Sequence, residues 1–507
     1  MSPSSLVQDL TDLSSRVDGH DKKVVEYAAE LIEQYGAQLK GLKWMASQRF
    51  RASSEKVAPG QLTMDFIAHL LAQSEQHKAA EAVAQPEART PRKKRKSKLD
   101  VLPVKQVDKT LPEADRQCAC GECKQPMGHD TSRQIIYEPA KLFMLEERVH
   151  KYACRPCGDG VVAAKATPKL IPGGLASSSL LAHLTVAKVE DCTPIERIGK
   201  QLARHGADIA PSTLYDWFAQ AGREAEHLLP HIKKDMLASK LISLDDTPFP
   251  AKNNEHPKHI QRGRLWLYIG DVDRVAFCQF TEDWKGKHPR GVLEAFTGDV
   301  QGDGYGGISA LFHGADPPSR FGCNDHARRK FYEAMRLGDS RAEKIVSMYA
   351  QLYAVERGVV DADANARLEA RQSNSKALWT DLAQEIRALD KGASPKGPLG
   401  KALTYWKRQE PTLSAFLDNG HVPISNAHVE RLLRTVALLR KNTLFVGSIE
   451  AGHRYAALLT LALNCALCGA NSFEYFSWLF DRLADGVFAR DALSVMPQAW
   501  IREQQTA

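Results

Sequence analysis

The sequence predicts a multidomain α/β protein, on three observations. The chain has 507 residues, more than one hydrophobic core normally organises. Its apolar period changes from helical to strand-like at residue 241, and a helical stretch from about 332 to 420 follows the strands. Its ten cysteines include two Cys-x2-Cys pairs, a spacing typical of a separate metal-stabilised module. Strands, long helical segments and a metal module together require several domains.

Composition is that of a globular protein, with 43% hydrophobic and 25% charged residues and a mean hydropathy of −0.36. No apolar stretch reaches the ~18 residues of a membrane span, and the first twenty residues lack the basic-then-apolar order of a signal peptide. We therefore expect a cytoplasmic protein with no membrane partner. The net charge of +7 permits nucleic-acid binding without arguing for it. In a reducing compartment the cysteines favour metal ligands or buried thiols over disulfides.

Residues 1–80 are predicted to be helical. Between 21 and 50, apolar side chains recur at three-four spacing, at Ala28, Leu31, Tyr35, Leu42 and Met45. This spacing fits either a short coiled coil of about three heptads or a plain amphipathic helix, and Gly36 and Gly41 weaken the first.

Residues 81–110 are predicted to be a linker. Its segment 89–98 holds seven Lys and Arg residues and no acid. Like charges repel and keep such a block extended, and basic arms of this kind often bind DNA phosphates, with a solvated linker as the alternative. The DNA contacts expected here are Arg92, Lys93, Lys94, Arg95 and Lys96.

Residues 111–170 are predicted to form a zinc ribbon. Cys120 and Cys123 make one Cys-x2-Cys pair, and Cys154 and Cys157 make another about thirty residues later. Four thiolates close a tetrahedral structural Zn²⁺ site with no open position, so the metal is expected to stabilise folding and not to catalyse. Cys118 is a spare thiol that could replace Cys120.

Residues 171–236 are predicted to be helical and to resemble a helix-turn-helix. Thr193-Pro194-Ile195-Glu196 fits a capping box that starts one helix. That helix ends near Gly206, and a second begins at about 211. Many helical hairpins have this pattern, so DNA binding does not follow from it alone.

Residues 237–331 carry three hairpin-linked strand patterns, at 241–246, 264–272 and 274–283, and two more near 298 and 320. Strands in this order, then helices, are typical of a ribonuclease H-like core, here with a helical insertion at 332–420. The core would resume at 421–450, before a helical C-terminal region at 451–507. In that architecture, acids on the first strand, after the fourth strand and on a late helix converge. Here these acids are Asp245, Asp303 and Glu430.

Four motifs follow one another along this core: LDDTP (244–248), GDGYGG (302–307), GCNDHARRKF (322–331) and NAHVERLLRTVALLRKNTLFVGS (426–448). With the cysteine segment and the helical region before the core, they resemble the insertion sequence 66 family of DDE transposases. The resemblance runs from about residue 40 to 486. It implies a DNA transposase that cleaves element ends and transfers the strands into target DNA.

The resemblance assigns the family's three catalytic acids to Asp245, Asp303 and Glu430. Two Mg²⁺ or Mn²⁺ ions held by carboxylates suit such phosphodiester chemistry. Asp246 stands where the family usually has Glu, and strand alternation turns it away from the metals, so we expect it to hydrogen-bond the turn at Thr247. The family has Asp-Asn-Asn where this sequence has Ser425, Asn426 and Ala427. This departure would affect the local positioning of Glu430 or the reaction rate.

The remaining expected DNA contacts are basic residues of the last two motifs, His326, Arg328, Arg329, Arg431, Arg440 and Lys441. Cys323 and His326 form a Cys-x2-His pair that is more often packing than metal ligation. We expect DNA and further copies of the chain as partners, small accessory proteins of the same element, and association with the bacterial nucleoid. Two alternatives stay open: a DNA-binding regulator with an inactive core, and a ribonuclease H-like nuclease that cleaves without joining.

Overall fold

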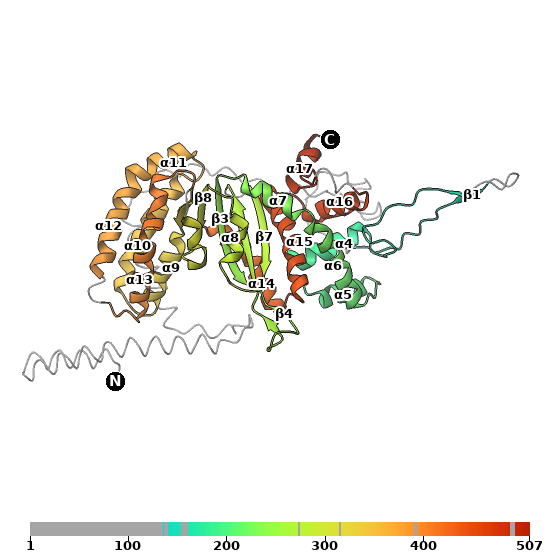
Figure 1. Ribbon diagram of the computed structural model, residues 1–507, viewed down its shortest axis with the longest axis horizontal. Helices are drawn as coiled ribbons and strands as arrows, with labels where there is room; N and C mark the ends of the chain where they lie inside the picture. Colours follow the sequence, from blue (N-terminus) through green and yellow to red (C-terminus); the bar gives the residue numbers. More distant parts are fainter. Residues whose placement is uncertain are drawn as a thin grey trace, which may run out of the picture. The chain divides into compact units, whose positions relative to one another are not determined.

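The computed structural model describes residues 135, 140–153, 161–271, 274–313, 316–389, 393–486 and 492–506. Contacts divide the chain into two units. One is Ser47–Pro139, and the other comprises Met1–Ala46 and Ala140–Ala507. All described helices and strands belong to the second unit (Figure 1). The predicted N-terminal helix, the basic block at 89–98 and the cysteines of the predicted zinc ribbon lie outside the described residues.

A five-stranded mixed sheet lies at the centre of this unit (Figure 1). Its strands are β3 (Leu241–Pro248), β6 (Arg264–Gly270), β7 (Val275–Thr281), β8 (Asp299–Gly302) and β9 (Ser319–Gly322). Their order is β7-β6-β3-β8-β9; β6 is antiparallel to β3 and β7, whereas β8 is parallel to β3 and β9. The five strand patterns predicted from the sequence are therefore confirmed.

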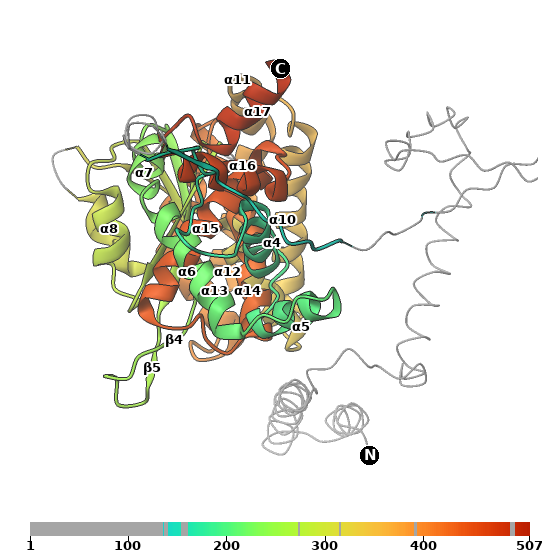
Figure 2. The same cartoon turned by 90° about the vertical axis from the view of Figure 1, so that its right-hand side faces the viewer.

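In the described part of the chain, two short strand pairs lie outside the sheet. β1 (Lys151–Ala153) pairs with β2 (Val161–Ala163), and β4 (Ala251–Lys252) pairs with β5 (Ile260–Gln261), both antiparallel. The β4–β5 hairpin connects β3 to β6 and projects away from the sheet (Figure 2). Between β7 and β9 the chain also forms α8 (Lys287–Leu293) and a 3₁₀ helix, η3 (Gly306–Phe312).

The edge strand β7 is covered by α15 (Ile449–Cys468). Asn464 accepts from the Ala276 N–H (3.1 Å) and donates to the Ala276 carbonyl (2.8 Å). Thr460 accepts from the Cys278 N–H (2.9 Å). These two residues, in the largely apolar stretch 455–468 of α15, satisfy backbone groups that an edge strand leaves open, which blocks pairing with another chain at these positions.

Within the described residues, four helices precede the sheet. They are α4 (Ser178–Val189), α5 (Ile195–Arg204), α6 (Pro211–Glu226) and α7 (Leu229–Leu237). The predicted capping box is wrong, because α5 begins at Ile195 with Pro194 as its N-cap and no side chain caps it. Thr193 Oγ1 instead donates to the Asp191 carbonyl, and Glu196 accepts from the Tyr215 hydroxyl (2.9 Å). The helix therefore starts one residue later than predicted, because Pro194 and not Thr193 is its N-cap.

The segment predicted to be a helical insertion is helical and has its own core. Its elements are α9 (Asn324–Arg336), α10 (Arg341–Gly358), α11 (Ala364–Ala370), the π-helical turn η4 (Arg371–Ser375), α12 (Lys376–Leu389), α13 (Pro398–Ser414) and the 3₁₀ turn η6 (Ala415–Asp418). Phe331, Trp379 and Trp406 are among its buried side chains, which form a cluster separate from the one beneath the sheet.

Arg371 lies fully buried in this helical segment. Its guanidinium donates to both Glu356 oxygens (2.8 and 2.6 Å) and to the carbonyls of Phe416, Asn419 and Val422. One side chain therefore ties two helices to the segment that leads back towards the sheet.

The chain closes with α14 (Ala427–Asn442), α15, α16 (Ser472–Ala484) and α17 (Pro497–Thr506). α14 packs on β3, α15 packs on β7 and α6, and α16 packs on α4. In the part of the chain that the structure describes, every helix is too short or too polar to cross a bilayer.

Candidate active site

Asp245 lies on β3, and Asp303 directly follows the neighbouring parallel strand β8. Ser243 on β3 pairs with Gln301 on β8, and Asp245 and Asp303 each stand two residues further along the chain. Paired residues of parallel strands project to the same face of the sheet, which brings the two carboxylates together. Asp303 also accepts from the Tyr305 N–H (2.9 Å), so the same aspartate fixes the turn that follows β8.

Glu430 reaches this place although 127 residues (430 − 303) separate it from Asp303. It lies in the first turn of α14, whose N-cap Asn426 is fully buried and donates to the Leu244 carbonyl (3.3 Å). Just before α14, the Pro423 carbonyl accepts from Gln301 Nε2 (2.6 Å). Two buried amides thus attach the start of α14 to the strands that carry the aspartates.

The electrostatics of Asp245 reflect the other acids around it. Its pKa is raised to about 8, chiefly by burial, and the charges of Asp303, Asp246 and Glu430 contribute to the rise. The Asp246 N–H, which donates to Asp245 Oδ1 (2.8 Å), opposes the rise. Such a cluster is stable only with protons or a bound cation to offset its charge.

Asp246 is held apart by a cationic and an aromatic side chain. It accepts from Arg264 Nε and from Trp284 Nε1 (3.1 Å), and not from the turn at Thr247 as expected. The Arg264 guanidinium lies 4.4 Å from the Trp284 ring, which also stacks on Tyr305 (centroids 4.6 Å apart). Burial raises the pKa of Asp246 by more than the Arg264 contact lowers it. Both oxygens of Asp246 therefore accept hydrogen bonds from side chains.

Glu430 has one oxygen engaged and one free. Arg329 donates to Oε2 (2.7 Å). His326 Nδ1 lies 3.4 Å from Oε1, within ion-pair distance, but the angle gives no hydrogen bond and both atoms are buried without a hydrogen-bonding partner. We take them as unpaired, because a hydrogen bond depends on direction as well as distance.

Cys323, His326 and Glu430 offer ligand atoms within 4.8 Å of one another. The Cys323 thiol is fully buried, which raises its pKa well above the ordinary value and keeps it protonated. A metal-binding cysteine must be a thiolate. In the metal-free protein, Cys323 is therefore a packed, protonated thiol.

The other expected DNA contacts have different surroundings. Arg328 lies 3.5 Å from Asp325, while Arg431 and Lys441 are exposed on α14. Arg440 donates to the Pro248 carbonyl (3.1 Å), so it also fastens α14 to the end of β3. The basic block and the cysteine pairs are not among the described residues, so their roles stay predictions.

The departure at residues 425–427 has a structural counterpart. Ser425, where the resembled motif has Asp, donates to Asp325 Oδ2 (3.2 Å). The other Asp325 oxygen accepts from the Tyr353 hydroxyl (2.9 Å). A carboxylate is therefore present beside residue 425, supplied by α9 and not by the α14 segment.

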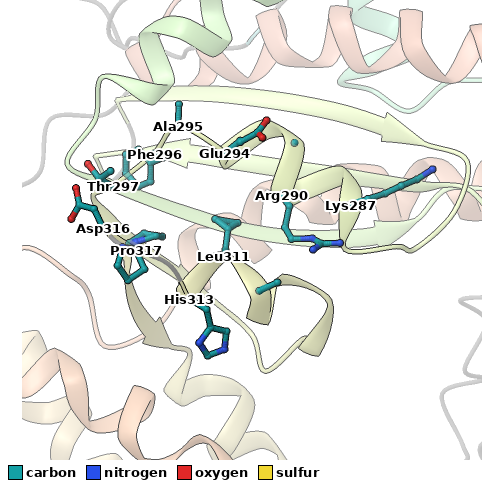
Figure 3. A pocket seen from close by; sticks show the side chains of 13 residues that line it. Lys287, Arg290, Glu294, Ala295, Phe296, Thr297, Leu311, His313, Asp316 and Pro317 are labelled. Carbon is teal, nitrogen blue, oxygen red and sulfur yellow. The ribbon is translucent and has the colours of Figure 1, made fainter.

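Two cavities among the described residues include none of the three acids. The larger, about 520 Å³, lies between α8 and η3, with Lys287, Arg290 and His313 in its lining (Figure 3). It also contains Glu294 and Asp316, so it has no single sign of charge.

Several residues that build the site were not found from the sequence. Gln301, Arg264 and Trp284 position the acids through contacts that only the folded sheet creates. A faint signal existed for Gln301, the one amide of a short strand segment between two glycines, Gly298 and Gly302. Nothing in the sequence connected Arg264 or Trp284 to Asp246.

Comparison with known proteins defines the class of protein as a transposase. Residues 173–454 match the family described as "Transposase IS66 family", and residues 115–158 match the "zinc-finger binding domain of transposase IS66". The first match covers more than half of the chain. The chain therefore belongs to the IS66 transposase family, as its motifs predicted.

Three uncharacterized proteins of Sinorhizobium fredii (strain NBRC 101917 / NGR234) are similar over most of their length. The protein y4jD is 28% identical over 78% of this chain and 80% of its own. The protein y4qI is 30% identical over 76% and 74%, and y4hP is 27% identical over 78% and 75%.

Proposed function

We propose that this transposase cleaves DNA at the ends of its element and joins those ends to target DNA in a ribonuclease H-like core. Asp245, Asp303 and Glu430 are its catalytic acids. One observation carries the proposal. The buried carboxyl of Asp245 feels the negative charges of Asp303 and Glu430, which are far from it in sequence. The order of three antiparallel strands followed by two parallel ones supports the proposed core.

The donor set fits divalent cations of the Mg²⁺ type. These ions prefer carboxylate oxygens and keep several waters, so three acids suffice as protein ligands. Burial and like charges already disfavour an ionised Asp245 without a cation, and Glu430 Oε1 is a buried oxygen without a hydrogen bond. Two such ions, when bound, would activate the attacking oxygen and stabilise the leaving oxygen.

The chain's own residues contribute position and charge. β3 is buried along its first four residues and holds Asp245 rigidly. Asn426 and Gln301 hold Glu430 near it. Arg329, which occupies one oxygen of Glu430, is half exposed and free to turn to a DNA phosphate when a cation takes that oxygen.

DNA contacts are proposed along the whole chain. The zinc-finger region, held by Cys120, Cys123, Cys154 and Cys157 or by Cys118 in place of Cys120, and the helical pair α5–α6 would recognise DNA. The basic arm at 89–98 would add contacts that do not depend on sequence. These regions would act as separate domains, with the boundaries predicted from the sequence.

The test is a cleavage and joining assay with Mg²⁺ and DNA that carries the terminal repeats flanking the gene. Wild-type protein should release the ends and join them to target DNA, and Glu430→Gln should do neither. Glu333→Gln, an exposed acid on α9, is the matched control and should be fully active. Cleavage without joining would instead identify a nuclease, and specific DNA binding without either reaction would identify a regulator.

A further inference from the structure

A second, smaller cavity lies away from the acids, lined by residues of α4, α6 and the start of α15. Its volume is about 220 Å³, several times the ~30 Å³ that a water occupies in the liquid. Its charged lining residues are Lys188, Arg454 and Asp216, the last of which is exposed on α6. Two cations therefore face one acid.

Lys188 is the unusual member of this lining. It is only 4% exposed, and within the described residues its ammonium group has neither an ion pair nor a hydrogen bond. Burial lowers the pKa of Lys188, while the charge of Glu196 acts in the opposite direction. Glu196 itself is engaged by the Tyr215 hydroxyl. A buried, unpaired cation destabilises a fold and usually indicates a missing partner.

The start of α15 adds further positive potential. Gly447, Ser448 and Ala451 line the cavity, and they surround the first turn of a 20-residue helix. Ser448 caps this turn by accepting from the Ala451 N–H (3.2 Å), and it donates to Glu450 (2.6 Å), which already places a carboxylate there. Of the helix N-terminus, only the dipole, partly offset by Glu450, therefore favours an anion. Arg454, one turn further along α15, packs against Gly222 of α6, where a larger residue would collide with it.

The cavity is linked by backbone to the strand that carries Asp245. The Val446 N–H donates to the Pro250 carbonyl (3.0 Å), and the Lys252 N–H donates to the Gly447 carbonyl (2.6 Å). Pro250 follows Asp245 by five residues (250 − 245). A group bound in the cavity is thus held in a fixed relation to β3 and to the projecting β4–β5 hairpin (Figure 2).

We infer that this cavity binds a phosphate group through Lys188 and Arg454, beside the N-terminus of α15, and that a backbone phosphate of the DNA substrate supplies it. The source of the phosphate rests on the proposed function. Bound there, the DNA backbone is anchored at a second point away from the acids, which fixes its direction across β3.

The test uses the full chain, random-sequence duplex DNA and the variant Lys188→Met, with Lys401→Met, an exposed lysine on α13, as control. DNA affinity should fall roughly tenfold in Lys188→Met, because the variant cannot donate a hydrogen bond to the charged phosphate. The log–log slope of affinity against salt should become shallower by about 0.9, the share of one phosphate. Lys401→Met should change neither.

Thermal denaturation with inorganic phosphate supplies the second readout. Phosphate should raise the Tm of wild-type protein and not that of Lys188→Met. Without phosphate, Lys188→Met should melt above wild type, because an unpaired buried charge is gone. Arg454→Gln, measured in the same way, replaces Lys188→Met if that variant does not fold.

Loss of phosphate stabilisation with an unchanged salt slope would overturn the DNA source and assign the cavity to free phosphate. No change in either readout would overturn the site itself. Neither measurement needs cleavage, so a protein that binds DNA without cutting it would refute the proposed function and leave this test intact.

Discussion

Replacing Asp245 by Asn should stabilise the protein when no divalent metal is bound. In the folded protein the pKa of Asp245 is raised from 3.8 to about 8. A raised carboxyl pKa means that the folded state binds more protons than the unfolded state, so stability falls as pH rises from about 4 to about 8. At pH 7 the loss is at most about 4 kcal/mol, from roughly three pKa units at ~1.4 kcal/mol each. Asn carries no charge, so the Asp245→Asn variant does not lose this stability.

The assay is urea denaturation in EDTA between pH 5 and pH 8. The difference in stability between Asp245→Asn and wild type should grow with pH over this range. Added Mg²⁺ should stabilise wild type, because the metal binds only the folded site, and should stabilise Asp245→Asn much less. The exposed control Glu333→Gln should follow wild type under all conditions.

DNA cleavage should fall in Asp245→Asn although stability rises. Loss of a metal ligand removes several kcal/mol of transition-state stabilisation, so Asp245→Asn should not cleave measurably. Asp246→Asn should lose only about 10- to 100-fold, because Asp246 contacts Arg264 and Trp284 and would act through the ligand beside it. If Asp245→Asn is less stable than wild type in EDTA at every pH, or if it alone of the two still cleaves, the assignment of these residues is wrong.

Three further outcomes are expected. Metal analysis of Cys154→Ser should show loss of Zn²⁺, because the proposed tetrahedral site loses one of its four thiolates; an unchanged zinc content would contradict the ligand set. Arg371→Met should lower the free energy of unfolding by about 3–5 kcal/mol in urea denaturation, since it leaves the Glu356 carboxylate and three carbonyls without their donor; a neutral effect would contradict the contacts described. Alanine at four residues of the basic arm should make the salt slope of DNA binding shallower by up to about 0.9 for each phosphate that is no longer neutralised, and an unchanged slope would make the arm a plain linker. Those four residues are Lys93, Lys94, Arg95 and Lys96.

The strands of the core could be predicted because their sequence signal is local. Buried runs such as 241–244 and 265–270 are mostly apolar on both faces, and each is directly followed by an aspartate. The position of Asp245 at the end of such a run was visible for the same reason. Family motifs then related it to two acids that no local pattern could connect.

The contacts that hold those acids could not be predicted, because they depend on register between distant segments. The partners of Asp246 come from β6 and from the turn after β7, and alternation alone left only the adjacent turn as a candidate. The capping box failed for a local reason, since Pro194 itself became the N-cap. Propensity rules rank such alternatives but do not choose between them.

The long separation between Asp303 and Glu430 is compatible with a rigid site because the intervening helices form an independent core. That core is closed by Arg371, whose carbonyl partners Asn419 and Val422 belong to the segment just before α14. Asn419 also donates to Asp299 on β8 (3.0 Å), and Gln301 on the same strand donates to Pro423. The returning chain is therefore fastened to β8 at two points before Asn426 reaches β3. The insertion therefore lengthens the chain without giving α14 more conformational freedom. The position of Glu430 depends on packing inside the helical segment as much as on α14 itself.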